Sequence, residues 1–450
     1  MTNASSPLQP ALPIRQFVVE PSQGVHGELV VPGDKSISHR AAILAALAEG
    51  ESLIKGFLRG SDCEATLRAL EVMGAQARRE SDELHVTGVG HRGLQPPQDP
   101  LDLGNSGTGL RLLAGLAAGT PGITVLTGDA SLRRRPMGRI AEPLRQMGAE
   151  VTLQEGNVAP VTIQGKKPLS RIRYTMPVAS AQVKSCVLLA ALAAEGQTWV
   201  GEPSPTRDHT ERLLPRFGVQ VHRQGGSWVG VCGPAIPKAT TLVVPGDLST
   251  AAFFLAAALL SPGGSLLLRS VGINPTRVGV LHIMQAMGGR IEIRNIRDRA
   301  GEPFADLLVQ HSALRGIQVP VGWVPMAIDE LPIIAILAAF AQGTTTIRGA
   351  EELRHKESDR IESLAEGLRA LQVPVEVFPD GLSIQGGSVG MGTVNSHGDH
   401  RIAMAFAMAG VASQGPITIN DCALVDTSCP GFAELACQIG IRLVTQEQPA

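Results

Sequence analysis

Basic and hydroxyl side chains stand directly in front of an apolar segment that is predicted to be helical. The stretch "GDKSISHR" (33–40) places Lys35, Ser36 and Arg40 before the run "AAILAALA". A helix N-terminus has unpaired N–H groups and about half a positive charge, so it attracts anions. Ser or Asp there is commonly an N-cap, but Lys and Arg oppose the helix dipole unless an anion balances them. The pattern therefore indicates a site for a strongly anionic ligand.

Five further apolar segments have polar front ends of the same kind. Cations also stand at the starts of the helices that follow, as in "RRRPMGR" (133–139), "TRDHTE" (206–211) and "HKESDR" (355–360). Such repeated departures from the dipole preference predict one shared ligand. The front "GDLSTAA" carries no base and is expected to be only structural. The five front ends are "GNSGTGLR" (104–111), "ASAQVKS" (179–185), "GDLSTAA" (246–252), "IDELPII" (328–334) and "GDHRIAM" (398–404).

Two of these motifs have ordinary structural explanations as well. Asp329 precedes the apolar helix of "IDELP" and is explained equally well as a helix cap or as a catalytic group. In "HKESDR", Lys356 and Arg360 are four residues apart, as on many solvated helix faces with salt bridges. Neither motif assigns a reaction by itself.

The elements that must position these residues come from an internal repeat. A helix that ends in the same kind of turn recurs at intervals of 68 to 84 residues, and each repeat also has an earlier, more apolar helix. Short β-branched stretches such as "ITVLTG" (123–128) and "TTTIRG" (344–349) predict strands after the apolar helices. Each unit therefore reads as strand, helix, strand, helix and one or two strands. The recurring turns lie at or near Gly74, Gly148, Gly218, Gly288, Gln372 and Gly440.

Six such units predict two α/β domains of three units each. A chain of 450 residues exceeds what one core usually supports. The matching turns "VPGDKS" (31–36) and "VPGDLS" (244–249) mark the best boundaries. We assign 33–245 to the first domain and 1–32 plus 246–450 to the second, so the chain crosses twice and forms a hinge.

Composition excludes several classes of partner. The net charge is −2 and aromatic residues are 3% of the chain, which argues against nucleic acid. The longest apolar runs fall short of the roughly 20 residues that span a membrane. The six cysteines lack CxxC spacing and the histidines lack metal-ligand spacing, so neither disulfides nor a metal site is expected. Without a signal or transit pattern, we expect a cytoplasmic protein with a short loose leader. We also expect a monomer.

Taken together, the motifs resemble the 5-enolpyruvylshikimate-3-phosphate synthase family. The matching segments span nearly the whole chain, and details such as "DASLRRRPMGR" are similar to the class II bacterial type. The resemblance implies an inside-out α/β barrel of three βαβαββ units in each domain. It implies transfer of the enolpyruvyl group of phosphoenolpyruvate to shikimate 3-phosphate, with no metal or organic cofactor. The motifs are "PGDKSISHR", "LGNSGTGLR", "RRRPMGR", "SAQVKS", "IDELP", "RHKESDR" and "GDHRIAMAF".

The same resemblance implies a role for individual residues. Asp329 is the candidate base and Glu357 the candidate proton donor, with Lys35 and Lys356 supporting proton transfer. Their neighbours are expected to push the two carboxylate pKa values apart. The residues expected to hold shikimate 3-phosphate are Ser36, Arg40, Ser180, Ala181, Gln182 and Arg207. Those expected around phosphoenolpyruvate are Lys35, Asn105, Gly107, Thr108, Arg135, Gln182, Arg360 and Arg401. Asp329, Lys356 and His400 are also expected to bind substrate.

Three positions refine this expectation. Class I members have a lysine where this chain has Thr427 and an asparagine where it has Glu352. Gly107 stands where some glyphosate-insensitive class II enzymes carry alanine, so we expect glyphosate to bind here. An alternative reason for glycine is a positive φ angle.

Two other functions stay open at this point. UDP-N-acetylglucosamine enolpyruvyl transferase has a similar fold and the same enolpyruvyl donor, but it typically has a lysine–asparagine pair where this chain has Lys35 and Ser36. It usually also has a reactive cysteine in the loop that here reads "RRRPMGR". The second alternative is a non-catalytic anion-binding scaffold, which would not need both Asp329 and Glu357.

Overall fold

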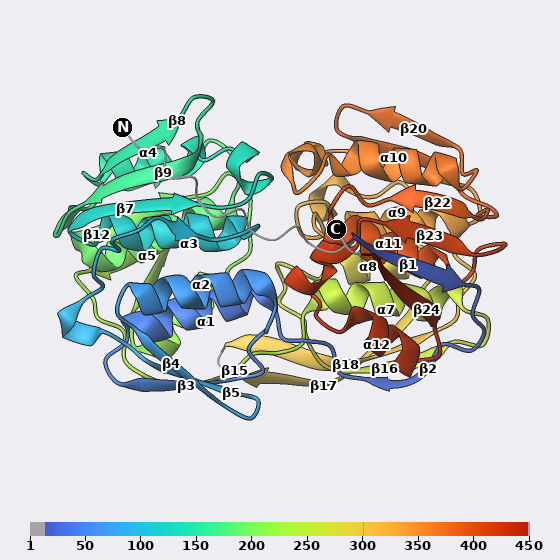
Figure 1. Ribbon diagram of the computed structural model, residues 1–450, viewed down its shortest axis with the longest axis horizontal. Coiled ribbons are helices and arrows are strands. Elements are labelled where there is room, and N and C mark those ends of the chain that lie inside the picture. Colours follow the sequence, from blue (N-terminus) through green and yellow to red (C-terminus); the bar gives the residue numbers. More distant parts are fainter. Residues whose placement is uncertain (1–13, 300, 449–450) are drawn as a thin grey trace.

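The protein folds into two α/β lobes that lie side by side (Figure 1). The computed structural model describes residues 14–299 and 301–448, so most of the expected leader lies outside the described residues. Within these ranges, no helix is both long enough and apolar enough to cross a membrane. The predicted α/β class with repeated units is confirmed.

Each lobe has its own hydrophobic core. The first core takes its buried residues from Ile37 through Val244. The second combines residues 17–31 with residues 248–443. The two ends of the chain therefore meet in one lobe, where β1 pairs antiparallel with both β23 and β24.

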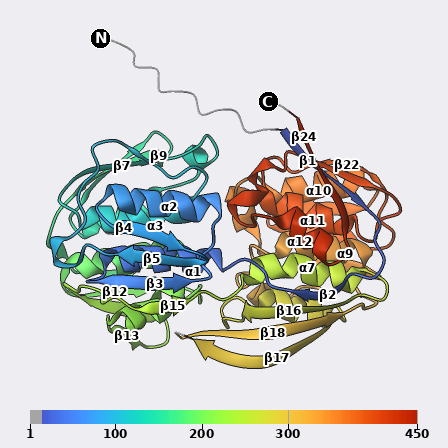
Figure 2. The ribbon, with the colours of Figure 1, turned by 60° about the horizontal axis from the view of Figure 1, so that its bottom comes forward.

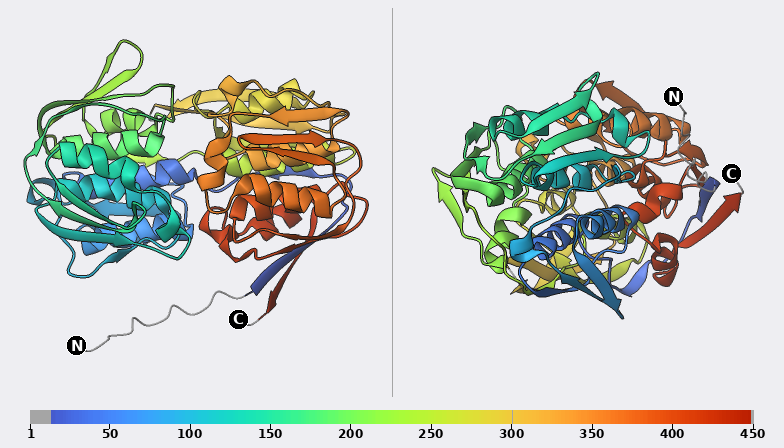
Figure 3. Two further views of the ribbon diagram at one scale, coloured as in Figure 1. Left: turned by 90° about the horizontal axis from the view of Figure 1, so that it is seen from above. Right: turned by 60° about the vertical axis from the view of Figure 1, so that its left-hand side comes forward.

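The first lobe repeats one arrangement three times. In each unit a buried helix is followed by a strand, a second helix and an antiparallel strand pair, and the sheets lie outside the buried helices (Figure 3). Its helices are α1(Lys35–Leu47), α2(Ser61–Val72), α3(Gly107–Ala118), α4(Gly138–Gln146), α5(Ala181–Ala190) and α6(His209–Leu213). Its strands are β3(Glu51–Lys55), β4(Gln76–Glu80), β5(Glu83–Thr87), β6(Leu101–Asp102), β7(Gly122–Thr127), β8(Glu150–Gln154), β9(Val158–Gly165), β10(Leu169–Ser170), β11(Arg173–Thr175), β12(Ala194–Gly201), β13(Val221–Gln224), β14(Trp228–Gly233) and β15(Thr241–Val243).

The second lobe follows the same plan. Its buried helices α7 and α9 have apolar side chains at nearly every position, so they have no polar face to turn to water and lie in the core. Its helices are α7(Leu248–Leu260), α8(Gly279–Ala286), α9(Leu331–Phe340), α10(Arg360–Ala370), α11(His400–Ala409) and α12(Phe432–Gln438). Its strands are β1(Ile14–Glu20), β2(His26–Leu29), β16(Ser265–Gly272), β17(Arg290–Arg299), β18(Glu302–Gln310), β19(Thr344–Ile347), β20(Val375–Phe378), β21(Gly381–Gln385), β22(Gly392–Asn395), β23(Ile417–Asn420) and β24(Arg442–Gln448).

The chain crosses between the lobes at two adjacent turns. Strand β2 lies in the second lobe beside β16, and the chain then enters α1 of the first lobe (Figure 2). Strand β15 lies in the first lobe beside β3, and the chain then enters α7 of the second. Gly33 and Gly246 form an antiparallel bridge where the crossings meet. A Cβ on Gly33 would lie 1.9 Å from the Gly56 carbonyl oxygen, so only glycine fits there.

The third unit departs from the regular pattern. Its second helix, α6, has five residues and gives way to a 3-10 turn over Leu214–Phe217. Pro215 lies in this turn and lacks the N–H that would continue an α-helix. The loop before α6 has no helix or strand over residues 202–208, and it carries Arg207.

Candidate active site

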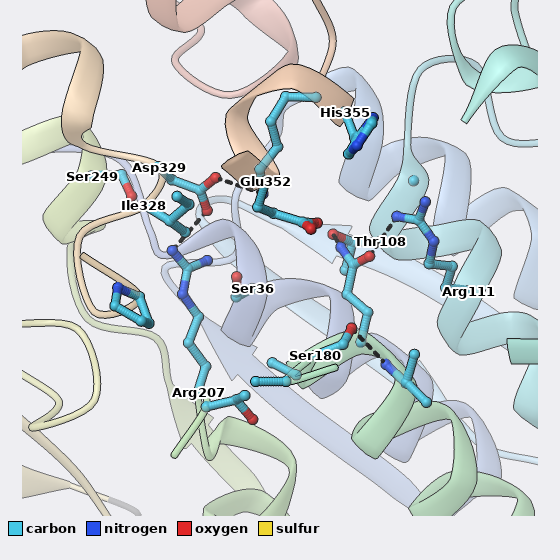
Figure 4. Close-up of a pocket in the computed structure, with 18 of the residues that line it drawn as sticks. Ser36, Thr108, Arg111, Ser180, Arg207, Ser249, Ile328, Asp329, Glu352 and His355 are labelled. Atoms are coloured by element: carbon cyan, nitrogen blue, oxygen red, sulfur yellow. Dashed lines mark hydrogen bonds and ion pairs between the residues drawn. The ribbon is translucent and has the colours of Figure 1, made fainter. Parts of the chain in front are cut away.

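A cavity of about 310 Å³ lies between the two lobes. In the close-up, Ser36, Thr108 and Ser180 belong to one wall, and Asp329 and Glu352 lie opposite (Figure 4). All but one of the residues that the sequence placed in the site line this cavity. These are Lys35, Ser36, Arg40, Gly107, Thr108, Arg135, Ser180, Ala181, Gln182, Arg207, Asp329, Lys356, Glu357, Arg360, His400 and Arg401.

The buried helices bring their N-termini to the cavity. At five of the six fronts, a polar side chain accepts a hydrogen bond from an amide of the first helical turn, as expected for N-caps. Residues of these helix starts line the cavity, next to the basic side chains. The capping residues are Asp34, Ser106, Ser180, Asp247 and Asp399.

Asn105 is the exception among the expected residues. It does not line the cavity, and its Oδ1 accepts a hydrogen bond of 2.6 Å from Nη2 of Arg135. Its Nδ2 donates to Asp129 Oδ2 at 2.8 Å. Asn105 therefore orients the cavity residue Arg135 but does not itself line the cavity.

Arg40 is held as a cation without a carboxylate among its hydrogen-bond partners. It is only 3% exposed, and its guanidinium donates to the Ser36 carbonyl and to the hydroxyls of Thr210 and Ser185 at 2.7 to 2.8 Å. Burial lowers the pKa of Arg40 to about 10, which still leaves it charged at neutral pH. Its charge is thus available to an anion in the cavity.

Arg111 is a cavity residue that sequence reasoning missed. Its Nη1 donates to Gln182 Oε1 at 2.6 Å, and Gln182 Nε2 donates in turn to Thr108 Oγ1 at 2.9 Å. Burial, with Arg135 nearby, lowers the pKa of Arg111 to about 10. The available signal was its place in "GNSGTGLR", one turn into the helix and on the face of Gly107.

The front "GDLSTAA", which the sequence left outside the site, lies at the cavity. Asp247 and Ser249 line the cavity. Arg277 supplies the base that this front lacks: its Nη2 contacts Ser249 Oγ at 2.5 Å and Asp247 Oδ1 at 3.3 Å. The cation comes from "NPTR", some 28 residues away in sequence, so the front alone did not reveal it.

Asp329 is surrounded by cations from both lobes. Its Oδ2 lies 2.7 Å from Nη2 of Arg207 in the first lobe, and its Oδ1 lies 3.3 Å from Lys356 Nζ (Figure 4). Burial acts to raise the pKa of Asp329, but the surrounding cations hold it well below its ordinary value of 3.8. Asp329 is therefore ionised at neutral pH, the form that a base requires. The cations responsible are Lys356, Arg207, Arg401 and Arg360.

Glu357 is paired in the same way. Its Oε2 lies 2.6 Å from Arg360 Nη2, and its Oε1 lies 3.3 Å from Nη1 of Arg135 in the first lobe. Burial acts to raise its pKa, but Arg360 and Arg135 hold it well below 4.5. Both carboxylate pKa values are thus lowered, and the structure does not display the expected divergence. The reason is that each carboxylate faces arginines.

His400 stands at the start of α11 on the second-lobe wall. It is 4% exposed, and burial together with nearby Lys35 holds its pKa well below 6.5. The imidazole is therefore neutral at physiological pH, and its Nε2 has no hydrogen-bond partner. A neutral ring at this position can accept or donate one hydrogen bond to a ligand.

Gly107 does not adopt a positive φ angle, so the conformational explanation for glycine there is wrong. A Cβ at this position would lie 3.0 Å from Arg135 Nη1 and 3.2 Å from Arg111 Nη1. An added methyl would therefore press on two cavity cations.

The two positions that differ from class I members have different surroundings. Glu352 lines the cavity rim and its Oε2 lies 3.2 Å from Nη1 of Arg139 across the cleft. Thr427 does not line the cavity, and its hydroxyl donates to the Leu424 carbonyl at 2.7 Å. Within residues 14–299 and 301–448, no group of three or more His, Cys, Asp or Glu could hold a metal ion.

Comparison with known proteins agrees with this architecture. A family model described as EPSP synthase (3-phosphoshikimate 1-carboxyvinyltransferase) matches residues 19–435. The 3-phosphoshikimate 1-carboxyvinyltransferase of Alkalilimnicola ehrlichii is 53% identical over 95% of this chain and 96% of the relative. That of Coxiella burnetii is 51% identical over 94% of this chain and 97% of the relative.

Solved structures give the same result. EPSP synthase from Acinetobacter baumannii has a TM-score of 0.86 at 45% identity, covering 96% of this chain and 100% of that one. The enolpyruvyl transferase NikO from Streptomyces tendae has a TM-score of 0.77 at 18% identity, covers 97% of this chain and 100% of its own, and is alike in fold alone. The family match and the close relatives establish that this chain belongs to the EPSP synthase family.

Proposed function

We propose that this protein transfers the enolpyruvyl group of phosphoenolpyruvate to the 5-hydroxyl of shikimate 3-phosphate and releases inorganic phosphate. One observation carries the proposal beyond family membership. Two partly buried carboxylates, Asp329 and Glu357, lie in one cavity among cations at helix starts. Such a cavity suits a reaction that binds two phosphorylated carboxylates and moves two protons.

The first step adds a proton to the methylene carbon of phosphoenolpyruvate while the 5-hydroxyl oxygen attacks C2. The hydroxyl loses its proton to Asp329, and Glu357 gives a proton to the methylene carbon. The resulting tetrahedral intermediate then expels phosphate and returns a proton from its methyl group to the ionised Glu357, which restores the enol ether. Lys35 and Lys356 support these proton transfers by their charge.

The arginines give Glu357 a means of becoming a donor. In the structure Arg135 and Arg360 contact its carboxylate and keep it ionised. When the phosphate and carboxylate of phosphoenolpyruvate engage these arginines, their hold on Glu357 weakens and its pKa rises. The substrate thereby prepares its own proton donor.

Shikimate 3-phosphate would occupy the first-lobe wall. Its phosphate fits Ser36, Arg40, Ser180 and Gln182, whose side chains stand at the starts of α1 and α5. Arg207 would then leave Asp329 for the ligand, freeing the base. Phosphoenolpyruvate would lie among Arg135, Arg360 and Arg401, with Lys35 and Gln182 close to both ligands.

We extend the proposal to five finer properties. The chain belongs to the class II type, its domains are 33–245 and 1–32 plus 246–450, and it works as a monomer in the cytoplasm. Support for the cytoplasm comes from six free cysteines, four of them buried. Glyphosate would bind competitively with phosphoenolpyruvate beside Gly107.

Phosphate release tests the proposed reaction. We expect release from phosphoenolpyruvate with shikimate 3-phosphate as acceptor and none with UDP-N-acetylglucosamine. Release only with the second acceptor would assign the other transferase activity, and release with neither would leave an anion-binding scaffold. The named relatives and the absence of cysteine from "RRRPMGR" favour the first outcome.

A further inference from the structure

The loop that carries Arg207 is tied to the body of the first lobe by a buried ionic network. The loop runs from the end of β12 to the start of α6 and reads "EPSPTRD" (202–208). Pro203 and Pro205 restrict its backbone, but it has no regular hydrogen-bonding pattern of its own. Its position must therefore come from contacts made by its side chains.

Glu202 supplies one group of these contacts. Its Oε2 accepts hydrogen bonds from the Thr206 amide at 3.1 Å and from the Thr206 hydroxyl at 2.7 Å. The same oxygen lies 3.0 Å from Nζ of Lys184. One carboxylate thus holds the residue directly before Arg207 and joins it to a buried ammonium group.

Lys184 connects this anchor to the helix that carries the other ligand groups. It lies in "SAQVKS", four residues after Ser180 on α5, is 1% exposed and does not line the cavity. Its Nζ also lies 2.6 Å from Oε1 of Glu211. Burying a lysine costs free energy unless carboxylates pair with its charge, as Glu202 and Glu211 do here. The network therefore relates the position of Arg207 to the N-terminus of α5.

We propose that Lys184 and Glu202 are positioning residues that hold Arg207 in place to receive shikimate 3-phosphate. This inference rests on the proposed function for the identity of the ligand. A loop held in its binding conformation loses less freedom when the ligand binds. Lys184 and Glu202 act only through Arg207 and touch no substrate.

Thr206→Val removes the hydroxyl contact to Glu202 and leaves every buried charge in place. Because Thr206 itself lines the cavity, its effect is interpreted together with the double-mutant cycle below. We expect the Kd for shikimate 3-phosphate, measured by calorimetry, to rise about 3- to 10-fold. The KM for phosphoenolpyruvate at saturating shikimate 3-phosphate should change less than about twofold, because its proposed arginines lie elsewhere. Equal increases for the two ligands would overturn the proposal.

A double-mutant cycle with Arg207→Ala separates positioning from general damage. If Thr206 acts through Arg207, Thr206→Val should have almost no further effect on the Kd in the Arg207→Ala background. The same fold-increase in both backgrounds would overturn the proposal.

Lys184→Met tests the buried cation directly. This variant removes the cation that Glu202 and Glu211 share, leaving only Arg223 beside Glu211, and so also lowers the Tm. Lys184→Arg should restore most of the affinity, because it keeps the charge. Arg223→Gln is the matched control: Arg223 contacts Glu211 Oε2 at 2.6 Å but has no contact with the loop, so affinity should not change. If Arg223→Gln lost as much affinity for shikimate 3-phosphate as Lys184→Met, the network would only stabilise the fold and the proposal would be overturned.

Hydrogen exchange keeps this test independent of turnover. The Thr206 amide, which donates to Glu202, should exchange several-fold faster in Lys184→Met than in the wild type, while amides of β12 stay unchanged. Unchanged exchange at Thr206 would overturn the anchor. If exchange rises as expected but the wild type binds no shikimate 3-phosphate, the anchor stands and the proposed function fails.

Discussion

The two walls of the cavity differ in their balance of charge. Among the described lining residues, the first-lobe wall has six Lys or Arg side chains and one carboxylate, Asp62, which pairs with Lys35 at 2.6 Å. The second-lobe wall has four Lys or Arg and four Asp or Glu side chains. An excess of cations favours anion binding, whereas matched cations and carboxylates can store and move protons. We infer that the first wall chiefly holds the ligand and the second chiefly performs the chemistry.

The largest effect should come from the chemistry on the second wall. Glu357→Gln keeps the side-chain shape but removes the titrating carboxyl group. We expect turnover to fall by about 10² or more, while the Kd for shikimate 3-phosphate stays nearly normal. Steady-state phosphate release and calorimetry measure the two quantities.

Glu352→Gln is the control on the same wall. Its carboxylate is 43% exposed and pairs with Arg139, so its loss should change turnover by no more than about threefold. Near-normal turnover of Glu357→Gln would remove that residue from the mechanism, and the division of labour between the walls would fail with it.

Substitutions on the first wall should change substrate binding more than turnover. Arg40→Lys keeps the charge but cannot reproduce three hydrogen bonds made by one planar guanidinium. We expect the KM for shikimate 3-phosphate to rise about tenfold or more, with a smaller change in kcat. A fall in kcat that equals the rise in KM would mean that the two walls are not separable.

Gly107→Ala tests the part of the first wall that lies beside the proposed phosphoenolpyruvate site. The new methyl would contact Arg135 and Arg111 at 3.0 to 3.2 Å and narrow the space beside them. We expect glyphosate to lose about 10- to 100-fold in affinity, equivalent to about 1–3 kcal/mol, and phosphoenolpyruvate to lose less. Inhibition and Michaelis constants of both forms check this, and proportional losses for the two ligands would contradict the steric explanation.

The smallest effect concerns stability against pH. Because the folded-state pKa of Glu357 is depressed, its ionisation stabilises the fold above pH about 4.5, and this stabilisation is lost as the pH falls through the folded-state value. The Gln variant lacks this titration. The difference in free energy of unfolding between wild type and Glu357→Gln should therefore shrink below pH about 4.5 in denaturant titrations. A difference that does not vary with pH would show that the arginines do not hold this carboxylate.

Much of the architecture followed from local patterns. Six polar segments before apolar helices, together with the recurring turns, predicted six units. Most of the candidate residues in those segments line one cavity. These signals are short in range: a cap, a helix dipole and an apolar face all lie within a few residues of one another. Sequence reasoning failed where the basic side chain that contacts a helix start comes from a distant part of the chain, as Arg277 does for Ser249.

Three features depended on the folded chain. Arg207 meets Asp329 across 122 residues, and Arg135 meets Glu357 across 222. These pairings lower both carboxylate pKa values, whereas the motifs led us to expect the two values to be pushed apart. Lys184 became interpretable only when Glu202 and Thr206 were seen beside it.

The order of residues along the chain was thus enough to predict the units, the helix starts and the kind of ligand, because those depend on neighbours in sequence. The partner of each charge depended on how the two lobes face each other. A carboxylate has no set pKa until its distances to cations and water are known, and those distances exist only in the folded molecule.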